Sequence, residues 1–397
     1  MTVPQDELAR VVRDHAGRLA ATLTHLLGDF SAAEDLVQDA VEAALRRWPV
    51  EGVPDRPDAW LFTVARNRGL DVLRRRARHR EKLAQLRWPV REEPDDRLRL
   101  LFTCCHPALP RHAQVALTLR TICGLTTAQI AAAFLVPEAT VAQRITRAKR
   151  KITDAGIPYR VPSDAELPER LNEVLTVVYL LYNEGYLSST GDSACSRRLA
   201  EDAEWLATSL AWTLPREPEV LGLLALIRLH QARAAARFDG SGRIVPLPEQ
   251  DRSRWDHAAI AGAGRLIARA AALGRPGPYQ LQAAIVACHA EAPGFADTDW
   301  AQIVVLYDML LTLAPSPVTR LQRAIALRHL AGPAAALEEV SALADQLDRY
   351  PLLHATRAEL LRALGAADEA READRRALDL TANPAQRALL EERLGGV

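Results

Sequence analysis

The chain has 397 residues, of which 49% are hydrophobic and only 5% aromatic, a composition that favours a helical protein of more than one domain. Its 50 basic residues balance its 50 acidic residues, but residues 1–155 carry a net charge of +6 and the remainder −6. The five cysteines include no CxxC pair, and no apolar run approaches membrane-spanning length. We therefore expect a cytoplasmic protein without a disulfide framework, metal, cofactor or membrane segment.

Helical periodicity runs through nearly every long segment, and no convincing alternating strand interrupts it, so an all-α fold is expected. Proline and charge mark the boundaries between its parts. The expected organisation is a helical unit at 1–80, a charged linker at 81–100, a second helical unit at 101–155, a proline-rich linker at 156–168 and a long helical remainder at 169–397.

The segment SAAEDLVQDAVEAALRRW, at 31–48, predicts an amphipathic helix. Ser31 followed three residues later by Glu34 is the pattern of a capping box, so the helix is expected to begin there. One face of this helix is apolar. The opposite face is mainly acidic and carries Asp35, Gln38, Asp39 and Glu42. Such a face suits either a solvated surface or a dock for a basic protein partner, and the helix alone does not decide between them.

The segment ARNRGLDVLRRRARHR, at 65–80, concentrates seven arginines against one aspartate. On a helical wheel its hydrogen-bonding and cationic side chains share a narrow arc that contains Asn67, Asp71, Arg74 and Arg78. Arginine suits phosphate oxygens, and both Asn and Arg can read exposed base edges. The arc predicts a nucleic-acid surface or, alternatively, a solvated basic face. Arg68 lies on the apolar side of the wheel and is expected to form a pair within the fold.

The segment LTTAQIAAAFLVPEATVAQRITRAKRKI, at 125–152, is the strongest local signal. Thr126 and Gln129 can cap a first helix reciprocally, and Pro137 fits the start of a second one. The second helix is apolar on one side. Its other side is polar and basic and carries Thr140, Gln143, Arg144, Arg147, Arg150 and Lys151. Two such helices are typical of a DNA-binding helix-turn-helix.

The long remainder contains an internal repeat near its end. Pro317 recurs as Pro351 and Ala324 as Ala358, an offset of 34 residues, which is the period of tetratricopeptide helix hairpins. Small residues at such positions let paired helices approach closely. Residues 169–315 have helix-pair character without this register, so we predict degenerate repeats there.

Taken in order, the acidic helix, PDAWLFTVARNRGLDVLRRR and the helix-turn-helix segment strongly resemble the extracytoplasmic-function (ECF) sigma factors, small bacterial factors that direct RNA polymerase to promoters. The resemblance covers residues 1–155 and implies sigma domain two at the front and sigma domain four at 101–155. LLYNEGYLSSTGD, at 180–192, and RFDGSGRIVPLPEQDRSRWD, at 237–256, resemble a subgroup with a tetratricopeptide-like C-terminal extension.

The resemblance also implies partners and contact residues. The acidic face of the first helix would dock on the clamp helices of core RNA polymerase. The flap of the polymerase would be a second binding site for the sigma factor. The minus-10 promoter element would meet Asn67, Asp71, Arg74 and Arg75, flanked by Arg78. The minus-35 element would meet Thr140, Gln143, Arg144 and Arg147, flanked by Arg150.

Three further motifs each allow more than one interpretation. FTCCHPALP, at 102–110, favours core packing of its two cysteines over metal binding, because adjacent cysteines rarely chelate one zinc. Two segments form a possible interdomain or ligand site: YNEGY and the long loop before the helix at about 257. The residues of this possible site are Asn183, Glu184, Tyr186, Asp251, Arg252 and Trp255. For the loop, buried salt bridges that pin it in place are an equally good interpretation.

The sequence therefore supports two functions of different class. The first is a sigma factor whose C-terminal repeats control its activity in cis, either by packing on the sigma domains or by contacting polymerase. The second is a helix-turn-helix regulator with a helical-repeat sensor domain that acts without replacing sigma. An enzyme is not expected, because no nucleophile–base pair or metal-spaced cluster accompanies Glu184, His230 or His257.

Overall fold

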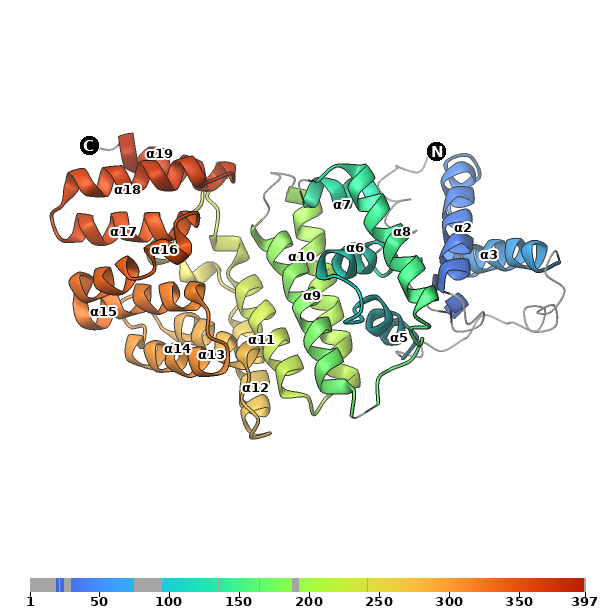
Figure 1. The fold of residues 1–397 in the computed structure, drawn as a ribbon, viewed down its shortest axis with the longest axis horizontal. Coiled ribbons are helices and arrows are strands. Elements are labelled where there is room, and N and C mark those ends of the chain that lie inside the picture. Colours follow the sequence, from blue (N-terminus) through green and yellow to red (C-terminus); the bar gives the residue numbers. More distant parts are fainter. Residues whose placement is uncertain are drawn as a thin grey trace. The chain divides into compact units, whose positions relative to one another are not determined.

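The computed structural model describes 19–20, 22–24, 30–74, 95–123, 125–134, 136–163, 165–187, 193–240 and 242–395. Within these ranges the chain is built from helices and forms no strand beyond one isolated antiparallel bridge between Phe238 and Ile244 (Figure 1). None of the described helices is both long and apolar enough to span a membrane. The chain divides into two compact units, and the boundary between them falls within one helix, between Ser209 and Leu210.

The first unit contains the two helical parts expected at 1–80 and 101–155 and the start of the C-terminal region. Its helices are α2 (Phe30–Glu51), α3 (Pro57–Arg74), α5 (Asp95–Cys104), α6 (Arg111–Thr121), α7 (Thr127–Ala133), α8 (Glu138–Asp154), α9 (Leu167–Leu187) and the first part of α10 (Ser193–Thr213). The second unit contains α11 (Pro218–Ala232), α12 (His257–Ala271), α13 (Pro278–Glu291), α14 (Trp300–Leu313), α15 (Pro317–Ser341), α16 (Ala344–Leu347), α17 (Pro351–Ala363), α18 (Ala367–Leu380) and α19 (Pro384–Gly395).

Helices α2 and α3 form a small bundle whose ends follow from the sequence. Gly52, at φ +85°, lets the chain turn after α2, because a left-handed conformation suits glycine. Pro57 opens α3, where its missing N–H costs nothing. Trp48 and Trp60 then pack edge to face with their ring centroids 5.3 Å apart. Leu61, on the inner side of α3, is fully buried.

The helix-turn-helix forms as the sequence predicts. The Thr126 main-chain N–H donates to Gln129 Oε1 at 2.9 Å, and the Gln129 N–H donates to Thr126 Oγ1 at 3.1 Å. This is a reciprocal capping box at the start of α7. Pro137 precedes α8. The buried stripe of α8 is the predicted one: Val141, Ile145, Ala148 and Ile152.

The structure differs from the sequence-based boundaries in two places. Helix α5 begins at Asp95, inside the segment expected to be a linker at 81–100. The proline-rich segment 156–168 does not separate compact units, because α9 packs against α5 and α6. Arg170 Nη2 donates to the Phe102 carbonyl oxygen at 2.5 Å. Sequence periodicity could not reveal this contact, since it joins residues 68 positions apart.

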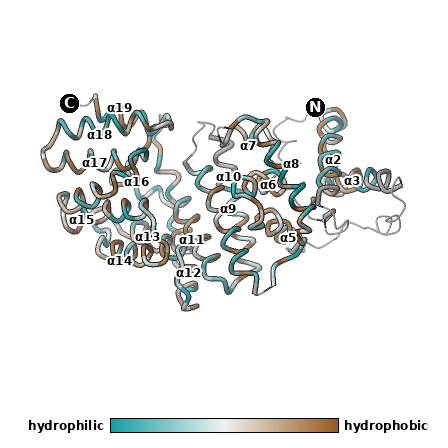
Figure 2. The backbone as a smooth tube through the Cα atoms, viewed as in Figure 1, coloured by the Kyte–Doolittle hydropathy of each residue, from teal (hydrophilic) through white to brown (hydrophobic). Residues whose placement is uncertain are grey.

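The predicted 34-residue repeat is visible in the packing of the second unit. Pro317 and Pro351 each open a helix, and Ala324 and Ala358 are both fully buried. Gly332, at φ +87°, breaks α15 into two helices, so that each repeat is a helix pair. Helices α17 and α18 lie side by side, and hydrophobic and hydrophilic residues alternate around α18 (Figures 1 and 2). The repeat prediction is confirmed for these two pairs.

A close approach of backbones holds the start of the second unit together. Helix α11 packs against both α12 and α13. A side chain at Gly222 would place its Cβ 2.6 Å from the main-chain nitrogen of Gln280. The Glu219 carboxylate accepts hydrogen bonds from the main-chain N–H groups of Tyr279 and Gln280 at 3.0 and 3.1 Å, at the start of α13. Glycine at 222 is therefore a packing requirement of this helix pair.

The half-buried His289 of α13 predicts a stability that falls in mild acid. Burial, together with the positive charges of Arg233 and Arg252, lowers its pKa from 6.5 to about 4. Between these two values the unfolded chain binds a proton at this site and the folded chain does not, so unfolding becomes easier as pH falls from 6.5 towards 4. We expect His289→Gln to flatten the decline of the free energy of unfolding over that range, by up to about 1.4 kcal/mol per pH unit, as measured by denaturant unfolding at each pH. His257→Gln, at an exposed position of the same unit, should leave the decline unchanged. Equal pH slopes for wild type and His289→Gln would contradict the assignment.

Candidate nucleic-acid and polymerase interface

The outer face of α8 presents the predicted DNA-contacting side chains to solvent. Gln143, Arg147 and Arg150 are exposed, one helical turn apart, opposite the buried stripe. Arg150 forms an ion pair along the helix with Asp154 at 3.3 Å. Thr140 is half-buried at the edge of this face. The arrangement leaves a continuous polar and basic surface on one side of the second helix of the helix-turn-helix.

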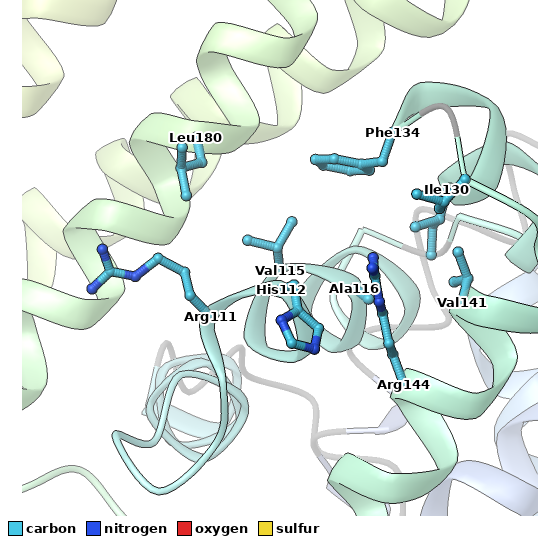
Figure 3. Close-up of a pocket in the computed structure, with 10 residues that line it drawn as sticks. Arg111, His112, Val115, Ala116, Ile130, Phe134, Val141, Arg144 and Leu180 are labelled. Atoms are coloured by element: carbon cyan, nitrogen blue, oxygen red, sulfur yellow. The ribbon is translucent and has the colours of Figure 1, made fainter. Parts of the chain in front are cut away.

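Arg144 lies differently from its neighbours. It is half-buried, and its side chain lines a cavity of 260 Å³ between α6, the helix-turn-helix and α9. Figure 3 shows this side chain extending between Val141 and Val115, below the ring of Phe134. Leu180 of α9 also lines the cavity. Arg144 therefore lies at the margin of the exposed face of α8, because the buried Val141 and Ala148 lie one turn before and after it on the helix.

The structure describes the backbone of α3 through Arg74 and places one residue of the predicted arginine-rich arc in full. Asn67 is exposed. Asp71 and Arg74 belong to α3, but their side chains lie outside the described part, as do Arg75 and Arg78 entirely. The prediction for Arg68 is confirmed, because its Nη1 lies 2.9 Å from Asp39 Oδ2.

The acidic face of α2 is only partly free. Asp35 and Glu42 are exposed, and Glu42 lies 3.7 Å from Arg46 one turn along the helix. Asp39 is paired with α3, as above. Gln38 Oε1 accepts a hydrogen bond from Arg120 Nη2 at 2.7 Å. Since Arg120 is the last basic residue of α6, this bond joins the first helical part of the chain to the second.

A second contact between these two parts was not predicted from the sequence. Glu34 was expected to cap α2, but its Oε2 lies 2.8 Å from Lys149 Nζ on α8, and the two side chains are 3% and 20% exposed. Helix α2 itself begins at Phe30, one residue before the predicted start. A buried carboxylate needs such a partner, since an unpaired buried charge is costly. In the sequence, the signal for this contact was that Glu34 is an acidic residue among the apolar positions of α2.

The cysteines of FTCCHPALP pack in the core of the first unit, as predicted. Cys104, the last residue of α5, and Cys105, which follows it, are both fully buried. Burial raises the pKa of both thiols, that of Cys105 to about 12. Burial and the nearby Arg170 lower the pKa of the neighbouring His106. Across the described residues no cluster of three or more His, Cys, Asp or Glu side chains could hold a metal ion.

The YNEGY motif is part of α9 in the first unit. Tyr182 is fully buried, and its ring stacks on Tyr186 with centroids 5.4 Å apart. Asn183 and Glu184 are half-buried on the same helix. The motif therefore falls in a different compact unit from the loop with which it was grouped as a possible interdomain or ligand site.

The long loop before α12 is held by an arginine and a tryptophan. Arg252 Nη1 donates to the carbonyl oxygens of His289 and Ala292 at 2.6 and 2.8 Å, at the end of α13. The same guanidinium lies 4.4 Å from the ring centroid of Trp255. Asp251 accepts from the main-chain N–H of Ser253 at 3.0 Å and so caps a short turn. Main-chain hydrogen bonds and a cation–π contact thus pin the loop here; buried salt bridges were one of the two interpretations that the sequence allowed.

Comparisons with known proteins agree with this arrangement. The family models for Sigma-70 region 2 and Sigma-70, region 4 match residues 11–79 and 99–152, and a family of unknown function matches residues 170–271. The chain is 44% identical over 376 residues to an uncharacterized protein of Rhizobium meliloti, covering 91% of this chain and 89% of that protein. It is 35% identical over 147 residues to the ECF RNA polymerase sigma factor SigL of Mycobacterium tuberculosis, covering 35% of this chain and 82% of that protein.

The regions that match are the two parts whose helices carry the candidate surfaces. Region 2 includes α2 and α3, and region 4 includes the helix-turn-helix α7–α8. The additional family begins at residue 170, near the start of α9. The chain belongs to the ECF RNA polymerase sigma factors and carries a further helical region after sigma region 4.

Proposed function

We propose that this sigma factor binds core RNA polymerase through α2, reads promoter DNA with α3 and α8, and is controlled in cis by the helical region that follows region 4. The observation that carries the proposal is the exposed face of α8. Gln143, Arg147 and Arg150 project from a capped helix-turn-helix in the region that matches sigma region 4. Amide and guanidinium groups on such a helix can read base edges in the major groove.

Promoter opening requires bases to leave the stack, at a cost of a few kcal/mol per base. Hydrogen-bonding and cationic groups can offset that cost by holding the separated strand. Asn67 is exposed on α3, in the part that matches region 2, and it is the first residue of the arginine-rich arc. Its exposure supports a role for this arc in holding the separated strand. Asp71, Arg74, Arg75 and Arg78 complete the proposed minus-10 surface.

Binding to polymerase is proposed for the acidic face of α2, which would meet the basic clamp helices, with region 4 on the flap. The exposed carboxylates of Asp35 and Glu42 support the first contact. Complementary charge speeds encounter and fixes orientation more than it adds affinity. Asp39 and Gln38 are proposed contacts as well, although both have partners within the free chain.

Control in cis is supported by the attachment of α9. Arg111 Nη2 lies 2.9 Å from both carboxylate oxygens of Glu173, which links α6 to α9. Arg170 bonds to the main chain at Phe102 on α5. The first helix of the extension is thus in direct contact with region 4, so a change in the extension can act on region 4 without a separate partner.

Arg147→Ala should weaken binding to the minus-35 element by about 1–3 kcal/mol, because the substitution removes a base contact. Gln143→Ala should act in the same direction, and both effects should depend on the promoter sequence. The measurement is the affinity of the polymerase holoenzyme for promoter fragments with and without that element. Arg357→Ala, an exposed arginine on α17, serves as the control. Equal loss on both fragments would show that Arg147 contacts only phosphates.

The double change Asp35→Lys and Glu42→Lys should lower affinity for core polymerase by roughly tenfold, since two attractive charges become repulsive. Titration of core polymerase with labelled full-length protein measures this. Glu51→Lys reverses an exposed charge at the far end of the same helix and should change the affinity little. A wild-type protein that binds promoter duplex but not core polymerase would favour a stand-alone helix-turn-helix regulator.

Truncation after Thr213 tests control in cis, because it keeps α9 and α10 and removes the remaining helices. We expect the truncated protein to bind core polymerase and to differ from the full chain by several-fold in run-off transcription. Higher output means that the removed helices inhibit, and lower output means that they are required. Equal output from the two proteins would remove the case for control in cis.

A further inference from the structure

Region 4 and the first helix of the extension surround an apolar cavity of 260 Å³ (Figure 3). Its aliphatic and aromatic lining comes from α6, the helix-turn-helix and α9, and includes Val115, Ala116, Ile130, Phe134, Val141 and Leu180. A dry cavity of about 150 Å³ with such a lining is large enough to bind benzene. The space therefore suits a molecule of the size of one aromatic ring with a short substituent.

We propose that this cavity binds a small apolar molecule with one carboxylate group, and that the carboxylate pairs with Arg144 and withdraws it from the minus-35 surface. The inference rests on the proposed function for this last step, because it needs α8 to read promoter DNA. It gives the control in cis a ligand of stated chemical class.

Arg144 provides the charge that such a ligand would meet. Its side chain is half-buried and extends below the ring of Phe134 at the cavity (Figure 3). Among the residues that the structure describes, no hydrogen bond or ion pair engages its guanidinium. A half-buried guanidinium of this kind favours a bound anion, because a charge-assisted hydrogen bond is about twice as strong as a neutral one.

The other arginine at the cavity already has a counter-charge. Arg111 Nη2 lies 2.9 Å from both carboxylate oxygens of Glu173. Arg111 and His112 are exposed, so the cavity opens to solvent on this side. One arginine charge in the lining is therefore uncompensated, which matches a singly charged carboxylate. A phosphate ester carries up to about two negative charges, and the second would face apolar walls.

The position of the cavity connects the extension to the helix that is proposed to read DNA. Helix α9 packs on α5 and α6, and α8 packs on α6 and α7. A molecule in the cavity would touch Leu180 of α9 together with Val141 and Arg144 of α8. Since the ligand and the minus-35 element both need the Arg144 guanidinium, each should weaken the binding of the other by the same factor.

Binding is tested on the full-length protein with phenylacetate as the probe. Phenylacetamide has nearly the same shape but no charge and is the ligand control. The readout is the Ile130 methyl resonance in protein with ¹³C-labelled isoleucine methyl groups, assigned by Ile130→Val, because Ile130 lines the cavity. We expect a saturable shift with phenylacetate and about tenfold weaker binding of phenylacetamide, which lacks the charge. The resonance of Ile260, a buried residue of the second unit, should not move.

Three variants locate the site. Arg144→Gln should weaken phenylacetate binding about tenfold and remove the preference over phenylacetamide. Lys151→Gln removes the same charge from an exposed position on α8 and should leave the binding unchanged. Leu180→Trp should fill the cavity from α9 and abolish binding while Arg144 stays in place. Leu180 is 37% exposed, so the larger ring can be accommodated without repacking the core.

The effect on Arg144 is measured with polymerase holoenzyme on promoter fragments with and without the minus-35 element. Phenylacetate should lower the affinity of the wild type several-fold for the fragment that has the element, and change little for the other. Phenylacetamide should have no such effect, and Leu180→Trp should not respond to either compound.

Other results overturn the proposal. These are an Ile130 resonance that does not respond to phenylacetate, equal affinity for phenylacetate and phenylacetamide, and tighter binding of phenyl phosphate than of phenylacetate. A preference for the carboxylate that persists in Arg144→Gln overturns it as well, and so does bound phenylacetate that leaves the minus-35 affinity unchanged. If phenylacetate binds as expected but the protein does not bind core polymerase, the proposed function fails and the ligand site stands.

Discussion

The ion pair between Glu34 and Lys149 is the constraint on which the arrangement of the sigma regions depends. Glu34 belongs to region 2 and Lys149 to region 4, and the carboxylate is almost fully buried. A buried pair of this kind adds little net stability compared with an apolar contact, but loss of one partner leaves an uncompensated charge. The pair therefore specifies which faces of α2 and α8 meet more than it strengthens their contact.

A different kind of contact attaches α9 to region 4. Arg170 is buried and bonds to a main-chain carbonyl, and Arg111 Nη2 donates to both carboxylate oxygens of Glu173. Apolar residues of α9, including the fully buried Val174 and Leu181, add to the core of this unit. The extension is thus a structural part of region 4 at its start, which explains why the compact unit ends within α10 and not at the proline-rich segment before α9.

Local signals in the sequence predicted the individual helices and helix pairs of this protein well. The capping box of α7, the buried stripe of α8, the pairing of Arg68 and the two helix pairs after residue 317 all follow from spacing and side-chain chemistry within one or two helices. Contacts between distant segments did not follow. Glu34 fits a capping box as well as it fits a buried ion pair, and only the position of Lys149 in space distinguishes the two. Arg144 and Arg147 look equivalent in the sequence, yet the packing of α6 and α9 places one at a cavity and the other in solvent.

The two attachments of region 4 differ in their chemistry. The contact with α2 includes the buried pair Glu34–Lys149, which salt screens much less than an exposed pair. The contact with α9 combines the buried Arg170, the partly exposed pair Arg111–Glu173 and an apolar interface. Loss of either attachment would expose buried groups, so both favour the arrangement of the first unit. A change in α9 would act through α6, which contacts α8 and whose Arg120 bonds to Gln38 of α2.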